Sequence, residues 1–561
     1  MTQAYQFKPH ERPVIPGSPF NPDHPRERMI AYGAIGVLAG LTGGLGNALV
    51  TANLSYFQGT LGLSTREAAW IPAAFVTTNV CANLVLVKFR QQFGLLLFVR
   101  LMLSLYIAAT AMHLFVHSEW SALLTRAVSG VAAAGLTTLG LLTWFQAMPA
   151  PKRLFGIILG VSIPQLATPL ARVLAPSLLE WGDWRVAYIF ELGLALLTLA
   201  AVIALPLPPS EREKAFERMD FVAIALLLPG VGLLCSVLAL GRTVWWTDAA
   251  WIGWALIGSI LLIGAAIAIE HRRTNPLLNT RFLGQWPILR IATIAICIRI
   301  VTAEQTFASV GLLSSLGYGI EQLQALYIVV TLASIAGLAA AIVTFRPQFP
   351  GRAIQVACLL IAIAAVMDSR ATNLTHPANL YLSQAMVGFA GLLFIGPAMV
   401  IGITRALLQG TQNFITWVVV FLATQNLGSL VGSALFGTLQ TVREKYHSNI
   451  LVQQVMLDNP NDAGRLAVSG QQLTGVLADP TLRSAEGAAL VSQRVTREAN
   501  ILAYNDVFLV IAILAFLLFL WGVAIELKMR RRGDISPIIQ FAQAMTAKLG
   551  AASQVKDPAR E

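Results

Sequence analysis

The chain has 561 residues, of which 56% are hydrophobic and only 12% are charged. Because a soluble globular protein carries about 25% charged residues, this composition excludes a water-soluble enzyme without a large membrane portion, and it also excludes a disordered, collagen-like or coiled-coil chain. The net charge of +11 does not indicate nucleic-acid binding, because the basic residues lie in short segments between apolar runs, as they do in membrane proteins.

The N-terminal segment 1–28 is polar and rich in proline, and the first apolar run begins only near Met29. A cleavable signal peptide has a basic start followed by an apolar core of about 7–15 residues. Since the segment lacks such a core, we predict that residues 1–28 form a flexible cytoplasmic tail.

From Met29 onward, apolar runs long enough to cross a bilayer recur along the chain, since a helical span needs about 20 residues. We predict fourteen spans and a C-terminal cytoplasmic tail over residues 527–561. The spans lie at about residues 29–53, 68–87, 95–116, 119–147, 155–179, 186–206, 220–240, 249–270, 289–314, 322–345, 352–369, 379–402, 413–438 and 503–526.

Basic residues in the short loops orient these spans. An even number of spans places both termini on one side, and the loops on that side hold most of the lysine and arginine residues. The short loops of the opposite side hold only Arg66, Arg185, Arg242 and Arg370. Positive charge concentrates on the cytoplasmic side of membrane proteins, so we predict an inner (plasma) membrane protein with both termini in the cytoplasm.

The segment 439–502 is a long and mildly polar connection between the last two spans. The predicted orientation places it in the periplasm. We expect a helix that begins near Leu482 and runs directly into the last span.

Parts of the sequence repeat at an offset of about 256 to 260 residues. The matches are residues 88–94 with 345–351, residues 126–130 with 384–388, and Gln165 with Gln425. This repeat predicts two six-span halves, an N-terminal bundle over 29–206 and a C-terminal bundle over 289–526, with residues 207–288 inserted as two further helices. Parallel halves of this kind are the design of major facilitator transporters, in which the substrate path lies between the halves.

Several motifs resemble those of the fourteen-span drug:proton antiporters of the major facilitator superfamily, of the EmrB/QacA type. They are Arg126 and Gly130 in the fourth span, Trp184-Arg185 before the sixth, Asp220 at the start of the seventh, Glu270, Asn275 and Pro276 after the eighth, and Gly317-Tyr318 after the ninth. The resemblance covers about residues 29–526. It implies an all-α membrane protein with the major facilitator fold, its fourteen helices arranged as two six-helix bundles plus two inserted helices.

The resemblance also implies proton-coupled multidrug efflux of small organic compounds. Such transporters often work with a periplasmic adaptor that reaches an outer-membrane channel, for which 439–502 is the candidate contact. The family's usual proton-coupling residues are replaced here, since Gly46 stands where an aspartate is common, and Ala171–Pro176 stands where a Gly-Pro motif is common. A second hypothesis is therefore an exporter or importer of a specific metabolite, such as a siderophore, with atypical or absent proton coupling.

Charged residues inside spans are the candidates for proton coupling, because a charge at membrane depth costs about 2.5–3.5 kcal/mol. Glu304 is the first candidate for the proton acceptor and Glu191 the second, since a carboxyl group remote from water holds a proton more readily. A purely structural role is the alternative for each. The five deep charges are Arg126, Arg172, Glu191, Arg299 and Glu304.

The partners of these charges follow from their positions. Arg126 either stabilises a neighbouring carboxylate or binds backbone carbonyl groups. Arg172 and Glu191 lie at similar depth on adjacent spans, so we predict an ion pair between them, with snorkelling to the outer interface as the alternative. Arg299 and Glu304 lie on different faces of one helix, so we expect separate partners for them.

Uncharged polar residues in the inner spans are candidates for substrate binding. Hydrogen bonding between helices is the alternative role, since polar residues in spans often supply it. The candidates are Asn47, Thr51, Gln165, Gln305, Gln425 and Asn426.

Enzymatic function is not indicated. The seven histidines lie at span ends or in loops, and the phosphate-binding motif GxxxxGK[ST] is absent from the sequence, so neither a haem-bearing span nor an ATP-driven pump is predicted. The four cysteines lie inside apolar runs without ligand spacing. We therefore expect no cofactor and no metal, and as partners only a small organic substrate, protons, the lipid bilayer and the adaptor.

Overall fold

A computed structural model describes residue 11 and residues 17–149, 152–454, 464, 468–469, 471–472 and 474–554. The predicted tails 1–28 and 527–561 and the predicted outer segment 439–502 lie partly outside these residues. Regular structure in the described part is helical, apart from an isolated bridge between Pro19 and Ser210.

Thirteen helical segments of the described residues are long and apolar enough to cross a membrane. They are α1 (Arg26–Ala52), α3 (Thr65–Phe93), α4 (Leu95–His113), α5 (Glu119–Ala147), α6 (Arg153–Ser162) with η3 (Ile163–Leu166) and α7 (Ala167–Glu180), α8 (Arg185–Ala204), α9 (Arg218–Val244), α10 (Ala250–Arg272), α12 (Trp286–Val301) with η4 (Glu304–Ala308) and α13 (Ser309–Ser315), α14 (Ile320–Val343), η5 (Pro377–Leu380) with α16 (Tyr381–Gln409), α17 (Thr411–Gln454) and α19 (Pro480–Arg532).

A fourteenth helix, α15 (Arg352–Asp368), has 17 residues and packs against α16 and α19. At about 1.5 Å per residue it reaches roughly 25 Å, which is at the short end of the range for a span. We count it as the fourteenth crossing, and each of the fourteen predicted ranges then coincides with one helix or with a succession of helical segments. The remaining helices are α2 (Leu54–Thr60), α11 (Thr280–Leu283) and α20 (Pro537–Gln554).

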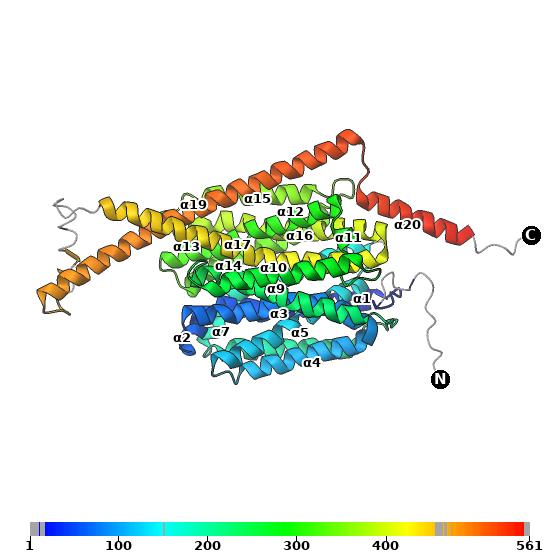
Figure 1. Ribbon diagram of the computed structural model, residues 1–561, viewed down its shortest axis with the longest axis horizontal. Helices are drawn as coiled ribbons and strands as arrows, with labels where there is room; N and C mark the ends of the chain where they lie inside the picture. Colours follow the sequence, from blue (N-terminus) through cyan, green and yellow to red (C-terminus); the bar gives the residue numbers. More distant parts are fainter. Residues whose placement is uncertain are drawn as a thin grey trace, which may run out of the picture.

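The helices form two groups with a pair between them. In the first group α5 packs against α1, α3 and α4, and in the second α16 packs against α14, α15 and α17. The inserted helices α9 and α10 pack on each other, and α9 contacts both α3 and α17. Figure 1 shows the first group in blue and cyan, with α9 and α10 in green between it and the second group. The two groups meet where α7 contacts α14 and where α6 contacts α16.

Helix ends follow local chemistry. Ser64 and Glu67 form a capping box at the start of α3, which satisfies backbone N–H groups that a helix end leaves free. Gly94 separates α3 from α4 with a φ of 88°, a conformation that residues with a Cβ rarely adopt.

Helices extend beyond the bundle at both of its ends. We call the end at which α1 begins and α19 terminates the inner end, and the opposite one the outer end; Figure 1 shows the two at opposite sides of the bundle. At the outer end α17 and α19 extend well past the other helices. The prediction that a helix near Leu482 runs into the last span is confirmed, since α19 is continuous from Pro480 to Arg532.

The sequence repeat has a counterpart in helix packing. Gly130 of α5 lies against Phe75 and Thr78 of α3, and its match Gly388 of α16 lies against Val330 and Ser334 of α14. In both halves a glycine therefore lets two helices approach closely at the same place. The exact boundaries 29–206, 207–288 and 289–526 stay a prediction.

Candidate functional site

A central cavity of about 380 Å³ lies between the two groups of helices. Residues of α1, α3, α5, α6, η3, α7, α12, η4, α16 and α17 line it, so both halves contribute. Five of the six predicted substrate-binding residues lie on its wall: Asn47, Thr51, Gln165, Gln425 and Asn426. The sixth, Gln305, is not among the lining residues and donates from Nε2 to the backbone oxygen of Gln384 at 3.1 Å.

Hydrogen bonding between helices accounts for part of this polar lining. Asn426 Nδ2 donates to Asn79 Oδ1 at 3.2 Å and so joins the two halves. Gln425 differs, because its side-chain Nε2 and Oε1 are buried without a hydrogen-bond partner among the described residues. Buried amides are normally satisfied, so Gln425 is the lining residue with the most free capacity for a ligand.

Three arginines, Arg90, Arg172 and Arg299, also line the cavity. The Arg172 guanidinium lies over the ring of Tyr327 of α14, 5.0 Å from its centroid. Arg299 Nε donates to the backbone oxygen of Gln425 at 3.2 Å. The predicted ion pair between Arg172 and Glu191 is wrong, because Arg172 points across the interface toward α14 while Glu191 is held within the first group.

A buried polar cluster occupies the outer part of the first group. Arg126 donates to the Gly46 carbonyl oxygen at 2.7 Å and to Asn47 Oδ1 at 2.8 Å. Glu191 accepts a hydrogen bond from Tyr106 at 2.6 Å and a longer one from Thr110 at 3.4 Å. Of the two predicted roles for Arg126, its hydrogen bonds match the binding of neutral acceptors, and within the described residues it forms no ion pair.

A second buried cluster lies in the other group, where Glu304 and Asp368 form a carboxyl pair and Gln384 is their common hydrogen-bond donor. Gln384 Nε2 donates to Glu304 Oε1 at 2.6 Å and to Asp368 Oδ2 at 2.8 Å. Gln384 therefore bridges the two carboxyl groups, and Glu304 Oε2 is buried without a hydrogen-bond partner among the described residues. Glu304 is 0% and Asp368 is 5% exposed. As expected, Glu304 and Arg299 have separate partners.

The two clusters occupy equivalent places in the repeat. Gly46, Thr110 and Arg126 correspond to Glu304, Asp368 and Gln384, each 258 positions further along the chain. In the first half Arg126 of α5 reaches Gly46 of α1, and in the second half Gln384 of α16 reaches Glu304 of η4. The carboxyl groups stand only in the second half at these positions.

Asp368 is a residue that reasoning from the sequence missed. It ends α15 and is followed by a turn, so in the sequence it resembles a loop residue at the membrane surface. The offset of the sequence repeat could have identified Asp368, because it aligns Asp368 with Thr110 and Glu304 with Gly46.

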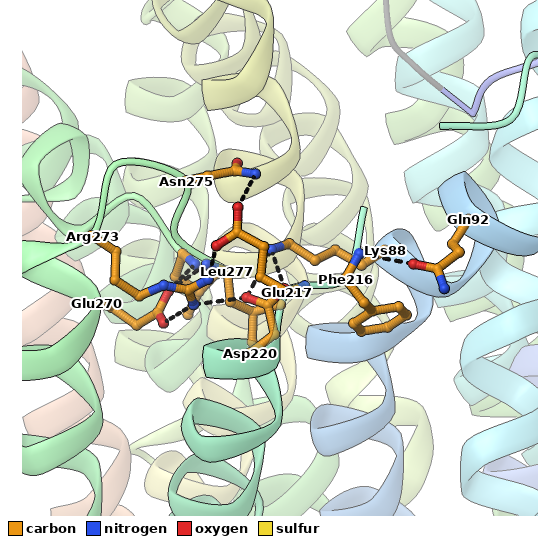
Figure 2. A network of polar contacts seen from close by, with 10 residues as sticks. Lys88, Gln92, Phe216, Glu217, Asp220, Glu270, Arg273, Asn275 and Leu277 are labelled. Atoms are coloured by element: carbon orange, nitrogen blue, oxygen red, sulfur yellow. Dashed lines mark hydrogen bonds and ion pairs between the residues drawn. The ribbon is translucent and has the colours of Figure 1, made fainter. Parts of the chain in front are cut away.

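An ionic network at the inner end joins the inserted pair to the first group (Figure 2). Asp220 of α9 accepts from Lys88 Nζ of α3 at 2.8 and 2.9 Å and from Arg273 Nη1 at 2.7 Å. Arg273 also contacts Glu270 at 2.7 Å and Glu217 at 2.8 Å. Asp220 and Glu270 are fully or almost fully buried, so charges at the α3, α9 and α10 ends are matched within the protein.

Loop residues complete this network. Asn275 Nδ2 donates to Glu217 Oε1 at 3.0 Å, and the backbone N–H groups of Leu277 and Leu278 donate to Glu270. The hydrogen bond from Arg273, followed by that from Asn275, lowers the pKa of the Glu217 carboxyl below its ordinary value. The motif residues Asp220, Glu270 and Asn275 thus hold the inserted helices in place.

Comparison with known proteins agrees with this architecture. The family model described as the Major Facilitator Superfamily matches residues 36–433. No curated protein matches the chain. Among solved structures, the human organic anion transporter MFSD10 (TETRAN) is similar with 14% sequence identity and a TM-score of 0.51, covering 88% of this chain and all of that one.

Tetrameric PepTSo2 is similar with 11% identity and a TM-score of 0.53, covering 90% of this chain and 99% of that chain. At such identities the likeness of either structure shows the fold alone. The match of the family model over most of the chain, together with the helical bundle around a central cavity, shows that this multi-pass membrane protein belongs to the Major Facilitator Superfamily and is a transporter rather than an enzyme.

Proposed function

We propose that the protein is a proton-coupled secondary transporter that exports small organic, drug-like compounds across the inner membrane, with both termini in the cytoplasm. The proposed direction of transport rests on the resemblance to the fourteen-span drug:proton antiporters. The observation that carries proton coupling is the carboxyl pair, in which Glu304 and Asp368 share the donor Gln384 away from water.

Two neighbouring carboxyl groups form a proton site because the free energy needed to ionise both of them at once is high. One proton shared between them removes one buried charge and allows a hydrogen bond from one carboxyl to the other. Loss of that proton leaves two like charges side by side at membrane depth, which is costly. Binding and release of a proton therefore change the favoured arrangement of α12, α15 and α16.

A short π-helical turn connects this site to the cavity. η4 begins at Glu304, which belongs to the carboxyl pair; the next residue, Gln305, bonds to the Gln384 backbone, and Thr306 lines the cavity. π-helical turns are frequent at functional sites. A shift of Glu304 on protonation would be passed to the cavity wall within two residues.

Glu191 remains the second candidate for the proton acceptor. It is fully buried beside Tyr106, and its Oε2 has no hydrogen-bond partner among the described residues. Arg126 is the positive group of this cluster, but it binds Gly46 and Asn47. The alternative function, export or import of a specific metabolite such as a siderophore with atypical or absent proton coupling, stays a second hypothesis.

The outer extension supports a periplasmic partner. α17 and α19 have 44 and 53 residues, roughly twice the length that a bilayer needs. Gln440 pairs with Asn500 and Arg443 with Asp506, so the two helices are held together where they leave the bundle. We propose this extension as the contact for an adaptor leading to an outer-membrane channel.

Site-specific crosslinking in cells tests this contact. A crosslinker at Val452, which is exposed, should capture the adaptor, whereas a crosslinker at Trp181 at the outer face of the bundle should not.

Reconstitution tests the coupling. Purified protein in liposomes should accumulate at least one of three dyes (fluorescein, rhodamine 123 or N-phenyl-1-naphthylamine) when a proton gradient is imposed. E304Q and D368N should abolish gradient-driven accumulation yet retain dye exchange without a gradient, because substitution removes the proton site and leaves the cavity intact. D183N is the matched control, since Asp183 is exposed and pairs with Arg185. Full gradient-driven transport by both variants would overturn the proposed coupling.

A further inference from the structure

We propose that the central cavity binds organic anions. The proposal concerns the substrate class of the transporter and so rests on the proposed function. It starts from the charge of the cavity wall, where Arg90, Arg172 and Arg299 supply three positive groups. Among the described residues that line the cavity there is no aspartate or glutamate.

Among the described residues, no acidic neighbour neutralises any of the three arginines. Within the described part of the chain, Arg90, Arg172 and Arg299 take part in no ion pair. Arg172 lies over an aromatic ring, and Arg299 donates to a backbone oxygen. The buried Nε of Arg90 has no hydrogen-bond partner among the described residues. A guanidinium at membrane depth without a counter-charge is costly. A buried charge whose partner is missing destabilises a protein strongly, because nothing compensates for its loss of hydration. An anionic ligand supplies the missing charge.

The carboxyl groups nearest along the chain do not serve as counter-charges. Glu304 is only two residues from the cavity-lining Thr306, but its side chain accepts a hydrogen bond from Gln384 and is absent from the cavity lining. Glu191 is held by Tyr106 and Thr110. The proton site and the positive cavity are thus separate, so the proton and the anion need not contact each other when both are bound.

The arginines lie at different depths along the cavity. Arg90 is three residues from the inner end of α3, and Arg299 is thirteen residues along α12 from its inner end. Arg172 lies on α7, whose last residue is at the outer end. At about 1.5 Å per residue, these positions run from close to the inner end to beyond the middle of the bundle. An anion that crosses the protein therefore meets a positive group at each stage.

The other residues of the cavity wall indicate the chemistry of the uncharged part of the ligand. Phe75, Phe145 and Phe414 contribute aromatic surface, and Gln425 offers an amide with both polar atoms free. Arginine binds carboxylates, sulfonates and phosphates through paired hydrogen bonds. The cavity thus fits an amphipathic molecule with an apolar or aromatic body and one such acidic group, and its volume is in the range that small ligands occupy.

Fluorescein and rhodamine 123 test this proposal because they share a ring system and differ in charge. Dye binding to the purified full-length protein in detergent is followed by fluorescence anisotropy. We expect saturable binding of the anion fluorescein and at least about ten-fold weaker binding of the cation rhodamine 123. R172Q and R299Q should each weaken fluorescein binding by about ten-fold, the loss of one charge-assisted contact, while R299K should retain part of the affinity.

The control is R66Q, since Arg66 is exposed at the outer start of α3 away from the cavity; its affinity for fluorescein should equal that of the unchanged protein. Monodisperse elution on size exclusion establishes that each variant is folded. Preferential binding of rhodamine 123, absence of fluorescein binding by the folded protein, or unchanged affinity in both R172Q and R299Q would overturn the anion site.

Failure of this proposal is distinguishable from failure of the proposed function. Binding in detergent needs no proton gradient, so loss of coupling in the liposome assay leaves the anisotropy result unaffected. Gradient-driven accumulation of rhodamine 123 alone would support proton-coupled export and exclude an anion-selective cavity.

Discussion

At the scale of residues, Gln384 is a side chain that bridges the carboxyl pair. Its amide nitrogen donates to both Glu304 and Asp368, a position that corresponds to Arg126 in the first half. A neutral donor there leaves the second half without a fixed positive charge beside its two acids, so a proton is the natural means of reducing their repulsion.

Replacement of this donor should be costly. Q384L leaves two buried carboxyl groups without their shared partner, and we expect the free energy of unfolding to fall by on the order of 3 kcal/mol, the cost of unsatisfied charged acceptors. Titration with sodium dodecyl sulfate measures the change. Q453L is the control, because the Gln453 bond to Asn449 is exposed, and an equal loss in both variants would contradict the role of Gln384.

The sequence predicted part of this chemistry. Glu304 stood out because an acid deep in an apolar run needs a protein partner. The Arg172–Glu191 pair was predicted from similar depth on adjacent spans, but these do not fix the face of a helix on which a side chain lies, and Arg172 points to Tyr327 instead. Asp368 escaped notice because a helix-terminal acid beside a turn has the same local sequence as a solvated one.

At the scale of elements, the ionic network around Asp220 fixes the inserted pair α9–α10 to α3. Asp220 receives hydrogen bonds from Lys88 and Arg273 and is fully buried. D220N should lower the free energy of unfolding by about 3–5 kcal/mol, because it leaves the buried Lys88 without its counter-charge. D183N, which affects an exposed pair, should cost less than about 1 kcal/mol. Denaturant titration compares them, and similar small losses would contradict a structural role for the network.

Glu217 makes the same network sensitive to acid. Its folded-state pKa is lowered by the hydrogen bonds from Arg273 and Asn275 relative to the ordinary value of 4.5. A group with a lowered folded pKa stabilises the protein above its unfolded pKa and loses that contribution as pH falls through the folded pKa. The thermal midpoint of the unchanged protein should exceed that of E217Q near neutral pH, and the difference should decline below pH 4.5 and vanish once the pH is below the lowered folded-state pKa of Glu217. A difference that persists there would contradict this contribution.

Helix positions were easier to predict than helix interruptions. Apolar run length is set by bilayer thickness, so all fourteen ranges coincide with helices. The predicted span 289–314 is in fact α12, η4 and α13 in succession, and no proline or glycine marks the change at Glu304. The extension of α17 to Gln454 was also not predicted, because residues beyond 438 are too polar to be recognised as a span.

At the scale of the whole molecule, the two halves are joined at their outer ends. Gln324 of α14 donates to the Val173 oxygen of α7 at 2.9 Å, and Tyr56 donates to Glu321 at 3.2 Å. Transport by alternating access requires these contacts to separate. The contacts between α7 and α14 therefore hold the two halves together at this place in the structure.

A crosslink at this position should arrest the cycle. Gln324 Nε2 lies 3.4 Å from Ser177 Oγ, so a protein carrying both S177C and Q324C should form a disulfide under mild oxidation. Dye exchange should then fall to the level of empty liposomes and recover on reduction, while each single-cysteine variant stays active. Continued exchange by the crosslinked protein would show that the outer ends need not part.

Simultaneous recording of lumenal pH and dye movement in liposomes tests the central claim most directly. In the absence of an imposed gradient, addition of a transported dye should change the lumenal pH with the unchanged protein, because each dye molecule moves against a proton. With D368N, dye should still exchange while the lumenal pH stays constant. Dye movement without any pH change in the unchanged protein, or an undiminished pH change with D368N, would contradict the account.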